Sequence, residues 1–88
     1  MDAFVVSYDL RVPGRDYGSL YDYLKSFPAW GHPLESLWVV ETAMSATALR
    51  DELKRRTDPS DGLLVVKSAH VASWNDVNCS SDWLKEHI

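Results

Sequence analysis

Alternation of apolar and polar positions is clearest near the N-terminus, where residues 4–10 read Phe-Val-Val-Ser-Tyr-Asp-Leu. This run is rich in β-branched and aromatic residues and contains no glycine or proline, so it predicts a β-strand. A period of two puts the larger side chains on one face of this strand: Phe4, Val6, Tyr8 and Leu10. The other face holds Val5, Ser7 and Asp9, so a carboxylate stands at the carboxyl end of an otherwise apolar strand.

Three helices are predicted from the spacing of the apolar positions. Residues 17–27 repeat them at intervals of three and four, with Asp16 as the N-cap. Residues 46 to about 57 form a second amphipathic pattern, with Ser45 as the N-cap and Leu49 and Leu53 turned inward. A short last helix over 82–87 would be capped by Ser80 or by the serine that follows it.

Two further strands are predicted, over 34–42 and 63–68, with a strong turn signal at 58–62 between the second helix and the last strand. Neither face of the 34–42 strand is purely polar, which suggests a sheet covered on both sides. An additional edge strand could lie in 29–35 or in 69–74. The order of elements predicts an α+β fold, a ferredoxin-like βαββαβ-type two-layer sandwich with helices on one face of an antiparallel sheet.

Composition limits the class of protein without identifying it. Eighty-eight residues make one domain over 1–88, with 73–88 as a loop and short C-terminal helix. The net charge of −4 argues against a surface built for non-specific nucleic-acid binding. The single cysteine, Cys79, allows no internal disulfide, so a reducing compartment, the cytoplasm, is the expected location. There is no signal peptide and no apolar run long enough for a membrane span, so no membrane association is expected.

Three segments together resemble a known family. They are Ser7-Tyr8-Asp9-Leu10, the strand centred on Glu35-Ser36-Leu37-Trp38-Val39-Val40, and Asp61-Gly62-Leu63-Leu64-Val65-Val66. With the intervening helices they make residues 3–68 similar to the small CRISPR-associated integration-subunit family (Cas-two-like), and in particular to its stand-alone SinR-like relatives. Virulence-associated protein D, a ribonuclease toxin, is similar in the same way.

This resemblance implies a ferredoxin-like protomer that dimerises through its sheet face, with Asp9 facing its symmetry mate. It also implies one of two roles, because many members are metal-dependent nucleases through that aspartate and others clamp DNA without cutting it. The chain departs from the family in its acidic charge, and in a tail from Ala69 onward that reads as a loop and helix in place of the family's dimer-crossing last strand.

Asp9 is the candidate catalytic and metal-binding residue. Mg²⁺, or Mn²⁺ in its place, usually takes one or two carboxylates together with waters and substrate phosphate oxygens. A two-fold axis would supply a second Asp9, and the metal would activate water against a phosphodiester. Arg11 and Arg15 flank the site and would contact phosphate bidentately. The alternatives are structural: Asp9 caps the loop 11–16 or pairs with Arg11 or Arg15, and the two arginines are solvated loop charges or pair with Asp16.

Three other features are open to two interpretations. Trp30, Trp74 and Trp83 border loops, where they would form a partner surface or pack beneath the loops, whereas Trp38 is expected in the core or a dimer interface. The basic residues of the second helix indicate a solvated face more strongly than a nucleic-acid track. The three histidines and Cys79 show none of the spacings typical of a zinc site.

Two functions follow from these patterns. The first is a homodimeric, divalent-metal-dependent endonuclease acting on RNA or DNA, with weak and salt-sensitive nucleic-acid affinity. The second is a non-catalytic dimer that binds a protein partner. Acidic residues in the turns and the C-terminal region would steer a basic partner to it: Asp58, Asp61, Asp76 and Asp82.

Overall fold

All 88 residues are described by the computed structural model of the chain. The elements in order are β1 (Asp2–Asp9), α1 (Gly18–Lys25), β2 (Trp30–Leu34), β3 (Leu37–Thr42), α2 (Ala46–Lys54), β4 (Gly62–Lys67) and α3 (Ser81–His87). The strands form one antiparallel sheet in the order β2-β3-β1-β4. The predicted α+β architecture with an antiparallel sheet is confirmed. None of the helices has the length and apolar character needed to cross a bilayer.

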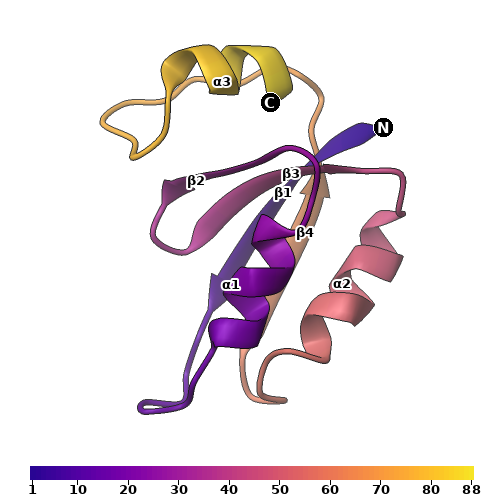
Figure 1. Cartoon of the computed structure of the whole chain (residues 1–88), viewed down its shortest axis with the longest axis vertical. Coiled ribbons are helices and arrows are strands. Elements are labelled where there is room, and N and C mark those ends of the chain that lie inside the picture. Colours follow the sequence, from indigo (N-terminus) through magenta and orange to yellow (C-terminus); the bar gives the residue numbers. More distant parts are fainter.

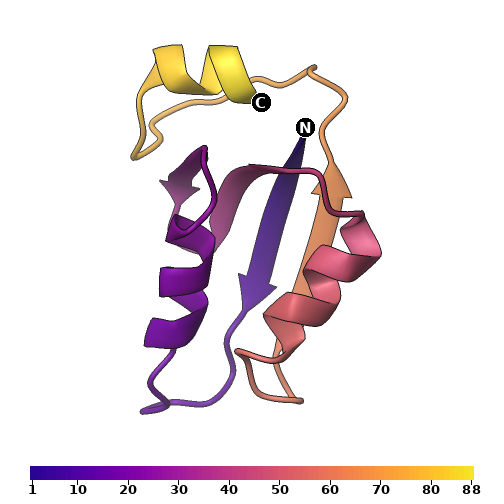
Figure 2. The ribbon, with the colours of Figure 1, turned by 45° about the vertical axis from the view of Figure 1, so that its right-hand side comes forward.

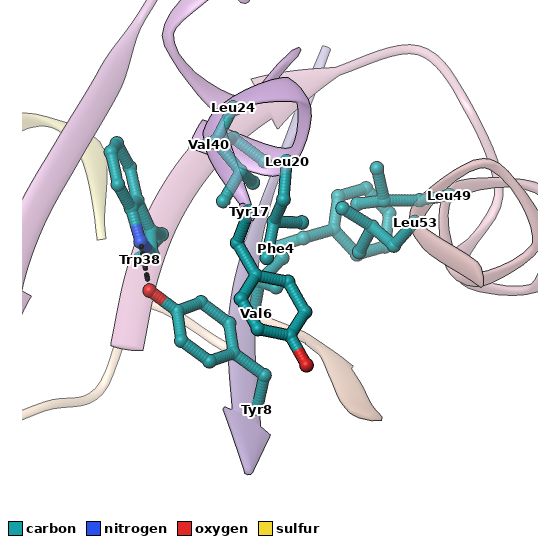
Figure 3. Close-up of a cluster of buried hydrophobic side chains, with 10 residues drawn as sticks. All are labelled: Phe4, Val6, Tyr8, Tyr17, Leu20, Leu24, Trp38, Val40, Leu49 and Leu53. Carbon is teal, nitrogen blue, oxygen red and sulfur yellow. Dashed lines mark hydrogen bonds between the residues drawn. The ribbon is translucent and has the colours of Figure 1, made fainter. Parts of the chain in front are cut away.

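Helices α1 and α2 lie side by side on one face of the sheet, whereas α3 lies across the end at which β1 begins (Figures 1 and 2). The core fills the layer beneath α1 and α2 (Figure 3). The side chains of β1 and β3 that point toward the helices pack there against the buried leucines of both helices. They are Phe4, Val6, Tyr8, Trp38 and Val40, against Leu20, Leu24, Leu49 and Leu53. The predicted inward positions of β1 and α2 are therefore confirmed, and Trp38 is a core residue.

The buried polar atoms of this core satisfy one another. Trp38 Nε1 donates a hydrogen bond to the Tyr8 hydroxyl over 3.0 Å, and that hydroxyl donates to the Glu35 carbonyl over 3.1 Å. A tryptophan and a tyrosine can be buried only where their polar atoms find such partners. The chain of bonds fixes the turn between β2 and β3 against the end of β1.

The predicted N-cap residues are confirmed for two of the three helices. Ser45 accepts from the Ala48 N–H over 3.0 Å at the start of α2, and Ser80 caps α3. At α1 the prediction was wrong, because the N-cap residue is Tyr17, without a side-chain cap. Asp16 instead accepts from the Gly18 N–H over 2.8 Å, which stabilises the turn leading into the helix.

The predicted strand 34–42 is wrong at its beginning. Residues 35 and 36 form a turn, and the chain before them is the separate edge strand β2. Of the two positions left open for an extra strand, 29–35 therefore contains one and 69–74 does not. Pro33 has no N–H to donate, so it fits an edge strand, and the pairing of β2 with β3 is irregular between Gly31 and Leu34.

The second face of the sheet is partly covered by the chain's own C-terminal segment. The Trp83 ring lies so close to Gly31 that a Cβ there would stand 2.5 Å from a ring carbon. His87 Nδ1 lies 2.8 Å from Glu41 Oε1, and Val39 is fully buried. A dimer contact through this sheet face, as the resemblance implies, can therefore use only part of the face, because α3 shields the part formed by β2 and β3.

The remainder of this face stays accessible and is called the open strip here. It consists of residues paired across β3, β1 and β4: Val5, Ser7, Leu37, Leu64 and Val66. Leu64 is 61% exposed and Val66 48% exposed. Neighbouring exposed apolar residues on a flat sheet surface are typical of an interface.

Candidate functional site

Asp9 is the last residue of β1 and lies opposite Gly62 of β4. Strand alternation places it on the same face as Val5 and Ser7, so it continues the open strip at one end. Its side chain is 71% exposed, and it lines a shallow hollow with Ser7, Gly62 and Leu64 among others. The carboxylate is therefore accessible both to solvent and to anything that covers the strip.

Asp9 pairs with Arg11, which is one of the structural alternatives left open by the sequence. Arg11 Nε lies 3.0 Å from Asp9 Oδ2, and Arg11 Nη1 donates to the Ser60 carbonyl over 2.9 Å. Both side chains are more than half exposed. An exposed ion pair of this kind contributes about 0–1 kcal/mol, so a divalent cation or a phosphate could displace it at little cost.

Asp9 does not belong to a ready-made metal site within its own chain. No group of three or more His, Cys, Asp or Glu side chains is placed to hold one ion. Mg²⁺ and Mn²⁺ need few protein ligands when substrate oxygens and waters complete their shells. The donor set thus suits such a metal only if a second copy of Asp9, or the substrate, supplies the missing oxygen atoms.

Arg15 lies at the acidic turn after α2. Its Nη1 is 3.4 Å from Asp58 Oδ2, and its guanidinium carbon is 5.4 Å from the centre of the Tyr17 ring. The predicted alternative pair with Asp16 is not the one formed. Arg11 and Arg15 both hold the 58–61 turn to the loop after β1, and their use as phosphate contacts stays a prediction.

Asp61 organises this corner, a role that the sequence did not assign to it. Its carboxylate accepts from the Arg11 N–H, the Asp58 N–H and the Tyr17 hydroxyl, over 2.7, 2.8 and 2.8 Å. Desolvation favours its neutral form, but these three donors outweigh it and hold the pKa of Asp61 below its usual value. The N–H and hydroxyl of Ser60 likewise lower the pKa of Asp58.

Most of the cationic side chains are already paired. Of the nine Lys and Arg residues, six have a carboxylate oxygen within 4.0 Å: Arg11, Arg15, Arg50, Arg55, Arg56 and Lys67. The remaining three, Lys25, Lys54 and Lys85, lie on three different helices. The structure therefore gathers no unpaired cations into one track. Of the basic residues in and just after α2, only Lys54 has no carboxylate partner.

The tryptophans near loops differ in their surroundings. Trp83 packs on Gly31 and on the His87 ring, 4.4 Å away between centres, and Trp74 Nε1 donates to Ser81 Oγ over 3.2 Å. Trp83 therefore packs between α3 and β2, and Trp74 bonds its loop to the start of α3. Trp30 is 39% exposed, with its ring 5.6 Å from that of Trp38, so it is the most accessible of the predicted partner residues.

A second hollow lies on the α1 side of Asp9. It is lined by Tyr8, Asp9, Leu10, Tyr21, Glu35 and Ser36. The His32 ring stacks on Trp38 behind it, 3.9 Å between centres, and its Nε2 lies 2.9 Å from the Glu35 carbonyl. Sequence reasoning missed this grouping, because the hairpin turn that brings Glu35 and Ser36 beside α1 was assigned to a strand.

Comparisons with protein-family models, with curated proteins and with solved structures found no match to this chain. The resemblance to the Cas-two-like family is therefore still a prediction from the residues quoted above.

Proposed function

We propose that the protein is a Cas-two-like homodimer that pairs through the open strip and hydrolyses phosphodiesters of RNA or DNA with Asp9 of each protomer. The order β1-α1-β2-β3-α2-β4 and the strand order β2-β3-β1-β4, with all neighbours antiparallel, support a ferredoxin-like protomer. The C-terminal segment is an addition to that plan.

One observation carries the proposal: the exposed carboxylate of Asp9 lies on the same sheet face as Leu64 and Val66. A two-fold axis through the strip would remove these apolar side chains from water and bring the two Asp9 side chains toward each other. Two carboxylates related in this way form a site for Mg²⁺ or Mn²⁺ that neither chain has alone.

When bound, the metal would supply a polarised water and neutralise charge on the phosphate. The protein's own contribution would be to hold the two carboxylates near the axis. Arg11, released from Asp9, would then be free to donate two hydrogen bonds to a phosphate oxygen pair.

The test compares Asp9→Asn with Asp22→Asn, an exposed aspartate on α1 that forms no hydrogen bond. We expect light scattering to give twice the 10.0 kDa chain mass for all three proteins. Cleavage of single-stranded RNA or duplex DNA should require Mg²⁺ or Mn²⁺, stop in excess chelator and be absent from Asp9→Asn only. Cleavage that survives either treatment would refute the site, and a 10.0 kDa species at micromolar concentration would refute the dimer.

A second candidate function is a non-catalytic dimer that binds a protein partner. It is favoured by the pairing of six of the nine cations within the chain and by the net charge of −4. Nucleic-acid affinity depends on cations that displace counterions from phosphates, and few are free here. Asp9→Asn would leave this function intact, so the same variant separates the two candidates.

A further inference from the structure

The hollow between β1, α1 and the β2–β3 turn has an aromatic wall and an acidic rim. The wall contains the rings of Tyr8 and Tyr21, whose centres lie 6.5 Å apart. Glu35 supplies the acidic rim, and no lysine or arginine lines the hollow. Asp9 also borders it, but the Asp9 side chain lies on the opposite face of the sheet, paired with Arg11. Its surroundings are therefore suited to a cation that also has a face to stack.

The position of this hollow is fixed by the core. The Glu35 carbonyl accepts from the Tyr8 hydroxyl and lies 2.9 Å from His32 Nε2, which holds the turn in place. The Tyr21 ring lies 18° from parallel to the buried Trp38 ring, 6.5 Å between centres. A ligand would thus meet a preformed site and would not have to order a loop.

Some polar groups around the hollow have no partner within the protein. The Tyr8 hydroxyl uses its proton on the Glu35 carbonyl and accepts from Trp38 Nε1, so it serves the fold. The Glu35 carboxylate forms no ion pair or hydrogen bond, and neither does the Ser36 hydroxyl. The free carboxylate can only accept hydrogen bonds, and the Ser36 hydroxyl can also accept, so the hollow suits a ligand rich in donors.

We propose that this hollow binds the guanidinium group of an arginine side chain on a protein partner. A guanidinium is planar and permanently charged, so it stacks on Tyr21 while it donates to the Glu35 carboxylate. A nucleotide would bring a phosphate toward the unpaired carboxylate of Glu35, which is unfavourable. The proposal rests on the second candidate function, and it specifies that the protein partner binds through an arginine side chain.

The experiment is an NMR titration of the full chain with the peptide acetyl-Gly-Arg-Gly-amide, using its citrulline counterpart as the neutral isostere. We expect saturable shifts of the Trp38 indole N–H and of the amides of residues 34–38. The citrulline peptide and the Glu35→Gln variant should each bind about two- to fivefold more weakly, the size of a partly exposed ion pair. Glu35 is exposed, so Glu35→Gln keeps the fold, and Glu86→Gln on α3 is the matched control.

Equal binding of the arginine and citrulline peptides would overturn the proposal, and so would an unchanged affinity in Glu35→Gln. Stronger shifts of the same signals with guanosine monophosphate would assign the hollow to a nucleobase and also overturn it. A protein partner that still binds Glu35→Gln would refute the arginine site while leaving the partner-binding function in place. Dimer mass and metal-dependent cleavage, which depend on the open strip and Asp9, report separately on the first candidate.

Discussion

The two faces of the sheet are built from the same four strands but are covered in different ways. On the helix face, Phe4, Val6 and Val40 are at most 2% exposed, beneath two helices that follow directly in the chain. On the second face, Val39 is fully buried under the C-terminal segment, whereas Leu64 and Val66 stay accessible. Both faces carry apolar side chains, so the alternation does not by itself determine which side chains are buried.

Because of this difference, the helix face should determine the stability of the folded protomer, and the second face should determine its assembly. Burial on the helix face is complete within one chain, and its buried polar atoms are paired, so this face supplies the core of the folded protomer. The second face is closed only where α3 reaches, and the open strip leaves apolar surface that a second copy could cover. Substitutions on the two faces should therefore change different measurable properties.

The largest expected effect comes from a leucine-to-alanine change made on each side of the sheet: Leu49→Ala in α2, on the helix face, and Leu64→Ala in β4, on the open strip. Leu49 has no exposed surface, so truncation leaves a cavity and should cost about 2–5 kcal/mol of unfolding free energy. Leu64 is 61% exposed, and its truncation in dilute protein should change stability by less than about 0.5 kcal/mol. Urea denaturation followed by tryptophan fluorescence measures both, and equal losses would contradict the distinction between the faces.

The next test breaks the cover on the second face. Gly31→Ala would place a Cβ 2.5 Å from the Trp83 ring, so α3 must move or the strand must shift, at a cost of about 1–3 kcal/mol. The control is Gly62→Ala, whose new Cβ would meet the end of the flexible Arg11 side chain at 3.0 Å. We expect limited proteolysis to cut the segment 69–80 faster in Gly31→Ala alone, and unchanged cutting would mean that α3 does not depend on this contact.

A third change sharpens the contrast at the open strip. Leu64→Lys places a charge where the proposed two-fold contact would bury it unpaired, so the dimer dissociation constant should rise at least about tenfold. Val71→Lys is the control, because Val71 is 90% exposed and lies outside the strip. Sedimentation equilibrium measures the constant. A similar change in both variants would place the interface elsewhere.

Local patterns were enough to predict the helix face. Ser45 and the spacing of Leu49 and Leu53 define α2, and the alternation in β1 identifies Phe4 and Val6 as core residues. The edge strand β2 was only one of two options, because Gly31 and Pro33 indicate a connection when they are read locally. Gly31 is explained by the Trp83 ring, which comes from a residue far along the chain.

The candidate site was likewise predicted only where it depends on residues that are neighbours in sequence. The place of Asp9 at a strand end follows from β1 alone, and its ion pair with Arg11 involves neighbours in sequence. The partners of Arg15 and Asp61 join loops more than forty residues apart, and no local pattern pointed to them. The hollow beside Tyr21 depends on the position of the hairpin turn, which the sequence placed inside a strand.

The smallest expected effect concerns the corner where both faces end, around Asp61. Its pKa is lower in the folded protein than in the unfolded chain, so the unfolded chain takes up protons first as the pH falls. The stability that the ionised carboxylate contributes is thus complete at neutral pH and is lost as the pH falls through the folded pKa, below about pH 4.

Asp61→Asn should therefore be less stable than the parent at pH 7, with a difference that narrows as the pH falls toward 3. Asparagine keeps one acceptor oxygen for the donors of Arg11, Asp58 and Tyr17 but loses the charge that strengthens all three bonds. Urea midpoints measured from pH 7 to pH 3 test this, with Asp22→Asn expected to follow the parent throughout. A difference that stays constant over this range would mean that the corner depends on the shape of the side chain at position 61 and not on its charge.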